Sequence, residues 1–506
     1  MLSAIDTLLD RVTMYRLTVY VLGALLATAA VLAGVGILPF SPVSLVVSVG
    51  ILSGLCWATN KVLARIFGIP SNVESALITA FILALIIDPI RTPDQLAFYG
   101  WVSVLAMASK YILSLKNRHF FNPAAIAVVV TGLALSDTAS WWLATTTMLP
   151  VTIIGGWLIV RKLGEEAMVG IYVAAALVTA VALTFIDHTS LLSGLQQLLV
   201  ASPLFFVGGV MLTEPLTAPP TRGLKRIYGI IMGVLMVPQF HVGALYLTPE
   251  LAIVLANIAA YLMSPGQRVM LKLQAKAKLA PDIYDFVFQP QAKLAFEPGQ
   301  YLECTLEHAH PDARGNRRYF TIASSPTEKV IHLGVRFYPK GSSYKRSLLA
   351  LGARRAILGT HIGGDFTLPR DPKKKLMLIA GGIGITPYRS MLKYLIDTRQ
   401  RRDVVVLYAN RSAADIIYRD VLLEAEAKLG ARVVYTLTDG ERAPHNWAGA
   451  VGRVDEHMIK AVAPDYHERT FYLSGPPAMV RAHEDALKRL GVPGRHIKKD
   501  SFLGLI

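Results

Sequence analysis

A glycine-rich stretch, LIAGGIGITP (378–387), is the part of the sequence best suited to bind an anionic group. It follows an apolar run and precedes an amphipathic one, so it is predicted to join a strand to a helix. Glycines let a backbone approach a ligand closely, and the N–H groups at a helix N-terminus favour phosphate. The candidate ligand-binding positions are Gly381, Gly382, Gly384, Thr386 and Pro387.

The elements around this loop are predicted to be short strands and helices. From about Arg268, stretches such as IYDFVFQP and VIHLGVRFY have the alternating pattern of antiparallel strands in a small barrel. After Lys373, apolar runs alternate with amphipathic helices, which predicts a parallel sheet. We therefore expect an antiparallel β-barrel domain at 266–370 and a Rossmann-like α/β domain at 371–506.

The first half of the chain has a different composition. Only 13 of the 51 Lys and Arg residues and 11 of the 35 Asp and Glu residues lie in 1–266. The basic second half shows no basic helix or aromatic-basic stripe, so we expect phosphorylated cofactors and an anionic membrane surface as partners, and no nucleic acid. Two cysteines, Cys56 and Cys304, exclude a disulfide framework and a four-thiolate cluster, and no metal site is predicted.

Ten apolar runs of spanning or near-spanning length follow one another in this first half. They lie at about 17–38, 42–59, 74–88, 96–114, 123–136, 143–160, 167–186, 191–213, 227–238 and 249–263. Basic residues cluster in alternate connections, and the opposite connections hold only Arg91. Because positively charged loops stay in the cytoplasm, residues 1–265 are predicted to form a multi-pass α-helical domain of the inner (cytoplasmic) membrane with both termini cytoplasmic.

A repeat of 126 residues runs through these spans. Asp88-Pro89 is repeated as Glu214-Pro215, and Asn122-Pro123 as Thr248-Pro249. Each copy contains five spans, an odd number, so the two copies are predicted to insert with opposite orientation. Inverted repeats with proline-broken segments often place a binding site at their interface. The alternative, that the acidic and proline pairs only mark helix ends facing water, stays open.

Two stretches, RHFFNPAAIAVV (118–129) and MLTEPLTAPPTRGLKRIYG (211–229), resemble a membrane flavoprotein shared by two redox complexes. These complexes are the Rnf ferredoxin:NAD oxidoreductases and the sodium-pumping NADH:quinone reductases. The resemblance covers about 15–263 and implies a ten-span fold that binds a flavin and moves electrons across the membrane. The residues it offers for flavin contact are Lys110, Asn122, Glu214 and Thr217. For Lys110, snorkelling to the cytoplasmic surface is the alternative.

That family often attaches FMN covalently to a Ser/Thr-x-Ala-Thr sequence, and this chain has none. The nearest string, LATTT (143–147), has Trp142 where the hydroxyl residue should stand. We therefore expect a noncovalent FMN or riboflavin in the membrane domain.

The stretch RRYFTIASSP (317–326), preceded by FEPGQYLE (296–303), resembles the FAD clamp of the ferredoxin-NADP reductase family. The resemblance implies that Arg318 pairs with the FAD pyrophosphate through its guanidinium fork, that Phe320 stacks, and that Thr321 bonds near the isoalloxazine ring. It extends to a second pyrophosphate loop in KGSSYKRSLL (340–349). The further residues it places at FAD are Ile322, Ser324, Gly341, Ser342 and Ser343.

The same resemblance covers about 268–506 and assigns the NAD(P)H site. LSGPPAM (473–479) corresponds to a Cys-Gly-Pro-x-x-Met signature that brings the nicotinamide to the flavin, with Ser474 in place of the cysteine. Near the end of the chain, Asp500 and Phe502 fall where the family keeps an acidic and an aromatic residue beside the flavin. The other residues implied at the nucleotide are Asn410, Arg411, Gly475, Pro476 and Met479.

These features predict a membrane-bound NAD(P)H dehydrogenase, an oxidoreductase that passes electrons from cytoplasmic NAD(P)H through FAD and the membrane domain. The acceptor is an extracytoplasmic flavoprotein or a membrane quinone, and the preference between NADH and NADPH stays open. Two alternatives remain: a redox-driven ion pump or transporter component, and a haem-type ferric reductase. The last needs paired histidines within spans, and His119, His188 and His241 lie near span ends or in loops.

Overall fold

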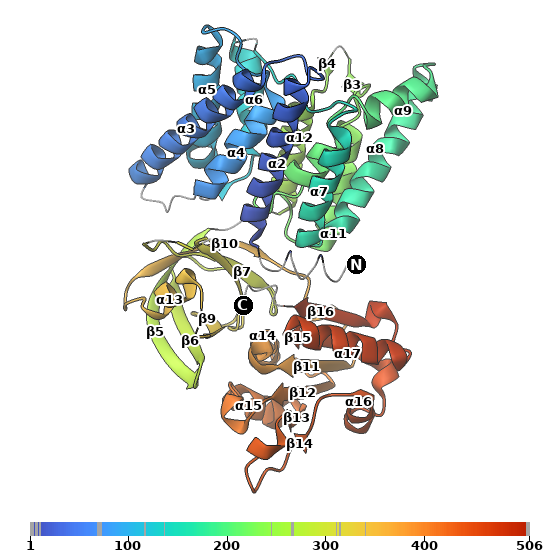
Figure 1. Ribbon diagram of the computed structural model, residues 1–506. Coiled ribbons are helices and arrows are strands. Elements are labelled where there is room, and N and C mark those ends of the chain that lie inside the picture. The colour runs from blue at the N-terminus through green and yellow to red at the C-terminus, as the bar shows by residue number, and fades with distance from the viewer. Residues whose placement is uncertain are drawn as a thin grey trace. The chain divides into compact units, whose positions relative to one another are not determined.

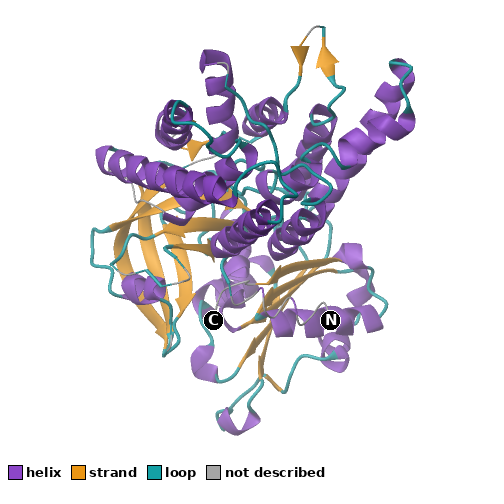
Figure 2. Cartoon of the chain, turned by 45° about the horizontal axis from the view of Figure 1, so that its top comes forward, coloured by secondary structure: helices purple, strands orange, loops and turns teal. Residues whose placement is uncertain are grey.

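The computed structural model describes residues 5, 9, 12–67, 73–115, 118–135, 137–243, 245–264, 268–309, 311–312, 315–339 and 341–501. The chain divides into two compact units, Met1–Gln267 and Arg268–Gly504. The first is built of helices and the second of two β-sheets with helices (Figures 1 and 2). After the predictions made from the sequence, we call them the membrane unit and the reductase unit, and each is described by itself.

The helices of the membrane unit coincide with the ten predicted apolar runs. Their bounds are α2 Met14–Gly34, α3 Pro42–Ile66, α4 Val73–Ile86, α5 Gln95–Ile112, α6 Pro123–Leu135, α7 Leu149–Leu163, α8 Glu166–Ile186, α9 Leu191–Leu199, α10 Leu204–Phe206, the π-helical η1 Val207–Met211, α11 Arg222–Leu235 and α12 Pro249–Met263. The run at 191–213 is broken, because α9 and the segment Leu204–Met211 meet at 46°. Their buried side chains form a single apolar core.

Helix length separates these helices into two groups. Among the described residues, α2, α3 and α8 are long and apolar enough to cross a membrane, and the broken pair at 191–211 makes a fourth if it is one span. The apolar helices α4, α6 and α12 have only 14, 13 and 15 residues, which is roughly 20 Å of helix against a hydrocarbon core of about 30 Å. Three to four spans are therefore evident by length, fewer than the ten predicted.

The 126-residue repeat is visible in the order of the elements. Shifted by that number, α6 falls on α12, and the hairpin β1–β2 (Ser114–Leu115, Arg118–His119) falls close to the hairpin β3–β4 (His241–Val242, Leu245–Tyr246). Each hairpin joins the last two helices of its copy, and α6 packs against α12 across the repeat boundary. Prolines at the first position of both helices, which need no backbone N–H there, explain why they begin at matching sites.

In the reductase unit, the first sheet has six antiparallel strands in the order β8-β7-β10-β5-β6-β9. Their bounds are β5 Val269–Ala280, β6 Ile283–Pro290, β7 Tyr301–Thr305, β8 Arg317–Thr321, β9 Ile331–Arg336 and β10 Ala356–Gly363, with the helix α13 Ser343–Leu349 beside them. Residues of β9 alternate between buried and half-buried, as expected when one face of a strand meets a core. The antiparallel prediction is confirmed.

The second sheet has six parallel strands in the order β14-β13-β12-β11-β15-β16. They are β11 Leu376–Gly381, β12 Val404–Asn410, β13 Arg432–Leu437, β14 Ala450–Val451, β15 Thr470–Gly475 and β16 Ile497–Ser501. One core covers one face with α14 Thr386–Asp397 and α15 Arg419–Leu429, and another covers the opposite face with α16 Glu456–Val462 and α17 Pro477–Arg489 (Figure 1). Strands buried on both faces explain the continuous apolar runs of the sequence.

Candidate functional site

The predicted phosphate loop lies at the carboxyl end of β11, between β12 and β15. The chain order changes direction here, and ligands of open α/β sheets bind at such a point. A Cβ on Gly384 would lie 2.2 Å from the Ser474 carbonyl oxygen, and one on Gly381 would lie 2.1 Å from the Met479 sulfur. Glycine is therefore required at 384, where the contact is with backbone, whereas the Met479 side chain near Gly381 can move aside. Both contacts show that the two predicted nucleotide stretches meet.

The chain end approaches the same place. Asp500 on β16 lies beside Ser474 on β15 in the parallel register, and its carboxyl group forms a hydrogen bond with the side chain of Thr321 at the end of β8. Burial raises the pKa of Asp500 from 3.8 to about 7, although the Thr321 bond opposes the shift. Ser474 is fully buried, and its hydroxyl has no hydrogen-bond partner among the described residues. Phe502 lies outside the described residues.

The predicted FAD clamp is assembled around one tyrosine. The Arg318 guanidinium lies 5.1 Å from the centre of the Tyr344 ring, and the Phe320 ring lies 6.0 Å from it. Tyr344 belongs to α13, so β8 and the predicted second pyrophosphate loop come together. Arg318 also donates to the Gly315 carbonyl at 3.3 Å.

Several predicted cofactor residues have structural partners in this conformation. Ser342 caps α13 by accepting from the Lys345 N–H, and the Ser343 N–H donates to Asp312 at 2.8 Å. Ser324 is fully buried and accepts from the His332 N–H. These groups hold the loops in place, and the Ser343 N–H is bonded to the Asp312 carboxylate. Ile322 and Gly341 lie in the same loops, and Pro476 is the N-cap of α17. Asn410 ends β12 and Arg411 follows it.

In the membrane unit, Asn122 and Glu214 meet across the repeat boundary. The Asn122 side chain donates to the Glu214 carboxylate at 2.9 Å, and its backbone N–H donates to Asn257 at 2.8 Å. Asn257 in turn donates to the Tyr228 hydroxyl at 3.0 Å. Thr217 donates to the Glu214 carbonyl at 3.3 Å. Buried polar groups in an apolar unit are costly unless they are paired in this way.

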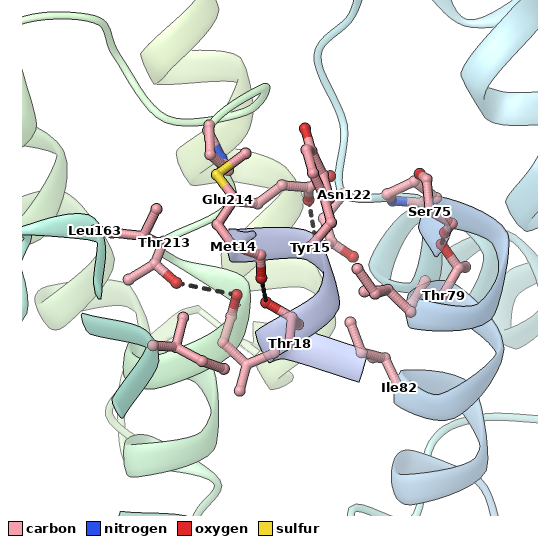
Figure 3. A pocket seen from close by; sticks show the side chains of 16 residues that line it. Met14, Tyr15, Thr18, Ser75, Thr79, Ile82, Asn122, Leu163, Thr213 and Glu214 are labelled. Atoms are coloured by element: carbon pink, nitrogen blue, oxygen red, sulfur yellow. Dashed lines mark hydrogen bonds between the residues drawn. The ribbon is translucent and has the colours of Figure 1, made fainter. Parts of the chain in front are cut away.

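Asn122 and Glu214 border a cavity (Figure 3). Its polar lining residues are Tyr15, Thr18, Ser75, Thr79, Asn122, Thr213 and Glu214. Lys110 adjoins the cavity, because it donates to Ser75 at 3.0 Å and to Thr79 at 3.0 Å. The volume is about 60 Å³, enough for a few water molecules but below the roughly 300 Å³ at which ligand pockets begin. The cavity in this conformation does not accommodate a flavin.

Comparison with known proteins identifies the reductase unit. A family model described as "Oxidoreductase NAD-binding domain" matches residues 378–485. The glycine betaine monooxygenase reductase subunit of Chromohalobacter salexigens is 28% identical over 227 residues, 44% of this chain and 60% of that protein. NADH-cytochrome b5 reductase 1 of Ajellomyces capsulatus is 30% identical over 250 residues, 47% of this chain and 79% of that protein. Through its C-terminal half, the chain belongs to the ferredoxin-NADP reductase family.

A solved structure also matches this half of the chain. The cytochrome P450 reductase GcoB of Amycolatopsis has 28% sequence identity and a TM-score of 0.42, covering 47% of this chain and 70% of its own. The chain spans 60% of the length of the Chromohalobacter relative. The resemblance of the membrane unit to the flavoprotein of the Rnf and sodium-pumping complexes stays a prediction.

The residues of the ferredoxin-NADP reductase unit fit FAD by two observations. The Asp500 carboxyl group forms a hydrogen bond with Thr321, the residue that the resemblance puts near the isoalloxazine ring. The Arg318 guanidinium and two aromatic rings supply the cation and stacking surface that a dinucleotide needs. In this fit, Arg318 would hold the pyrophosphate, and Thr321 and Asp500 would face the flavin ring.

One group of residues in this unit escaped the sequence interpretation. Arg389, in the first turn of α14, donates to the Glu328 carboxylate at 2.9 and 3.1 Å and to the Ala323 carbonyl at 2.8 Å. Its partners are more than 60 positions away in the chain, so no local sequence pattern predicts the contact. The only signal in the sequence was a charged residue on the side of an amphipathic helix that faces the protein interior.

Proposed function

We propose that this protein is a membrane-bound NAD(P)H dehydrogenase that passes electrons from cytoplasmic NAD(P)H through FAD to an acceptor in or beyond the membrane. The observation that supports the reductase part best is the convergence of Thr321, Ser474 and Asp500, from three strands and both sheets, at the carboxyl edge of the parallel sheet. The acceptor is a membrane quinone or an extracytoplasmic flavoprotein.

FAD, when bound, would supply the hydride chemistry between NAD(P)H and the acceptor. The protein's residues supply placement and charge. Arg318 balances the pyrophosphate charge, and the loop 381–385 with the N-terminus of α14 faces the nucleotide phosphates. The Ser474 hydroxyl, which has no partner among the described residues, would bond the nicotinamide carboxamide. Asp500, hydrogen-bonded to Thr321, holds or releases a proton near neutral pH beside the ring.

For the membrane unit, we propose an inner-membrane domain with both termini in the cytoplasm. The ten helical segments with their charge asymmetry, and the repeat seen in the element order, support it. The short helices and breaks beside Asn122 and Glu214 match the broken helices that line central sites in repeat-built membrane proteins. Since the interface cavity holds only water-sized ligands, we assign no flavin to it.

Of the alternatives, an ion pump is favoured by the half-buried Glu214 carboxylate at the repeat boundary. A haem-type reductase is disfavoured, because the histidines of the membrane unit, at 119, 188 and 241, all lie outside its helices. Haem ligation across a membrane needs histidines on facing helices.

The test uses the intact protein in liposomes, with NADH outside and ferricyanide sealed inside. We expect NADH to bleach the flavin absorbance and to reduce the sealed ferricyanide or an added lipid quinone. The double variant Asn122→Ala/Glu214→Gln should still bleach but should lose transfer to the sealed acceptor. Reduction of only external ferricyanide would rule out the transmembrane route, and reduction that stops when sodium is removed would favour the pump. Counting the flavins released on denaturation shows whether the membrane unit holds one of its own.

A further inference from the structure

The first turn of α14 contains two neighbouring residues, Tyr388 and Arg389, that contact different domains of the reductase unit. The Tyr388 hydroxyl is fully buried and shares its single proton between the carbonyls of Tyr472 at 2.7 Å and Ile379 at 3.1 Å. These residues belong to β11 and β15, the strands that lead into the two nucleotide loops. Tyr388 therefore ties α14 to the side of the unit that would hold the nicotinamide.

The next residue, Arg389, is attached to the other domain. It is 8% exposed, and its guanidinium forms the two-pronged pair with Glu328 in the connection between β8 and β9. The same guanidinium donates to the Ala323 carbonyl and lies 5.3 Å from the centre of the Tyr418 ring. Burial alone opposes ionisation of Glu328, but the bonds and charge of Arg389 outweigh it and lower the pKa of Glu328. The pair is therefore charged at neutral pH.

The segment that Arg389 contacts begins at Ala323, two residues after Thr321, the candidate contact of the flavin ring. Ser390 adds a second bond, from its hydroxyl to the Ser324 carbonyl at 2.6 Å. Glu328 accepts from the Ser325 N–H at 2.6 Å. The backbone of residues 323–325 is thus held at three successive positions, two by α14 and one by the partner of Arg389.

A buried ion pair is a weak source of stability, because desolvation offsets most of the attraction, but it enforces one geometry. We propose that Arg389 is a positioning residue that sets the distance and angle between the nicotinamide and the flavin. This inference rests on the proposed reductase function. Misplacing reactants by about 1 Å can slow a reaction about a hundredfold, so a loss of this contact should appear in the hydride-transfer rate more than in nucleotide affinity.

The chain offers a matched control in Arg469. This arginine is 6% exposed and donates two bonds to Asp465, at 2.7 and 2.9 Å, and others to Asp403 and the Leu376 carbonyl. It has nearly the same burial and the same kind of partners as Arg389, but all of them lie within the nucleotide domain. Removing it damages that domain without releasing the barrel.

The experiment compares Arg389→Met, Arg389→Lys, Glu328→Gln and Arg469→Met in the full-length protein. The measurements are FAD affinity by flavin fluorescence, nucleotide affinity, the rate of flavin bleaching by NADH in stopped flow, the long-wavelength charge-transfer absorbance between nicotinamide and flavin, and the melting temperature. We expect Arg389→Met to bleach about a hundredfold more slowly and to lose the charge-transfer band, with nucleotide affinity changed much less than the rate. Lysine keeps the charge but not the fork, so Arg389→Lys should fall between.

Arg469→Met should lower the melting temperature and leave the charge-transfer band in place. If Arg389→Met lowers the melting temperature as Arg469→Met does, with band and rate unchanged, the positioning role is wrong. If Arg389→Met does not retain FAD, the test uses Arg389→Lys and Glu328→Gln, which keep side-chain size. The charge-transfer band and the bleaching rate of these two variants then show whether Arg389 has the positioning role. An unmodified protein whose flavin neither NADH nor NADPH reduces would refute the proposed function itself; a normal parent with unaffected variants refutes only this inference.

Discussion

Replacing Asp500 with asparagine should change how the flavin potential depends on pH. Burial raises the pKa of Asp500 from 3.8 to about 7. At pH 7 about half of the molecules hold this proton, whereas an ordinary aspartate would hold it in roughly one of a thousand. Below pH 7 the carboxyl group is neutral and can donate to Thr321, and above pH 7 it places a negative charge near the ring.

The sign of the effect follows from that charge. A reduced flavin is itself negatively charged, so above pH 7 reduction draws a proton onto Asp500. For a two-electron couple, one extra proton adds about 30 mV per pH unit to the fall of the potential. The midpoint potential of the intact protein should therefore fall more steeply above pH 7 than below it. Asp500→Asn cannot take up the proton and should show no break.

The assay is spectroelectrochemical titration of the flavin from about pH 5.5 to about pH 8.5, a range that brackets the Asp500 pKa, with Asp485→Asn on the exposed side of α17 as control. Folding gives a second readout. The folded protein binds a proton at Asp500 that the unfolded chain has released between about pH 4 and pH 7, so Asp500 should make stability fall as pH rises through that window. Equal potential slopes for the parent and Asp500→Asn, or a break near pH 4, would refute the buried-carboxyl argument.

Three further predictions concern the reductase unit. Gly384→Ala puts a Cβ 2.2 Å from the Ser474 carbonyl oxygen. It should lower stability by about 1–3 kcal/mol in thermal unfolding and weaken nucleotide binding in NADH titration. Gly352 has open space around it, so Gly352→Ala should change neither quantity. Ser474→Ala should weaken nucleotide binding in isothermal titration by about 1 kcal/mol, the worth of one neutral hydrogen bond. Ser474→Cys should still permit flavin bleaching. An unchanged affinity of the alanine variant would show that Ser474 is not part of the site. Arg318→Ala should reduce FAD affinity by about 2–3 kcal/mol, the worth of a hydrogen bond between charged groups. Retention of FAD on gel filtration measures this loss. An FAD content equal to that of the parent would contradict the role of Arg318 in FAD binding.

Helix bounds in the membrane unit were largely available from local sequence. The predicted runs at 123–136 and 249–263 match α6 and α12 almost residue for residue, because a proline at N1 after a capping side chain marks a helix start closely. The break at 200–203 was hidden inside one apolar run, since apolarity predicts burial in the bilayer but not a continuous axis.

The site divides in the same way. The sequence alone determined the two-part composition, the antiparallel and parallel sheets, and the candidate binding stretches at 318–324, 381–387 and 473–479, because strand periodicity and glycine-rich stretches are local signals. Only the tertiary structure decided that Asp500 bonds Thr321, that Ser343 is engaged by Asp312, and that Arg389 reaches Glu328. Such pairs join residues distant in the chain, and their partners are chosen by the packing of whole elements, which no short stretch of sequence encodes.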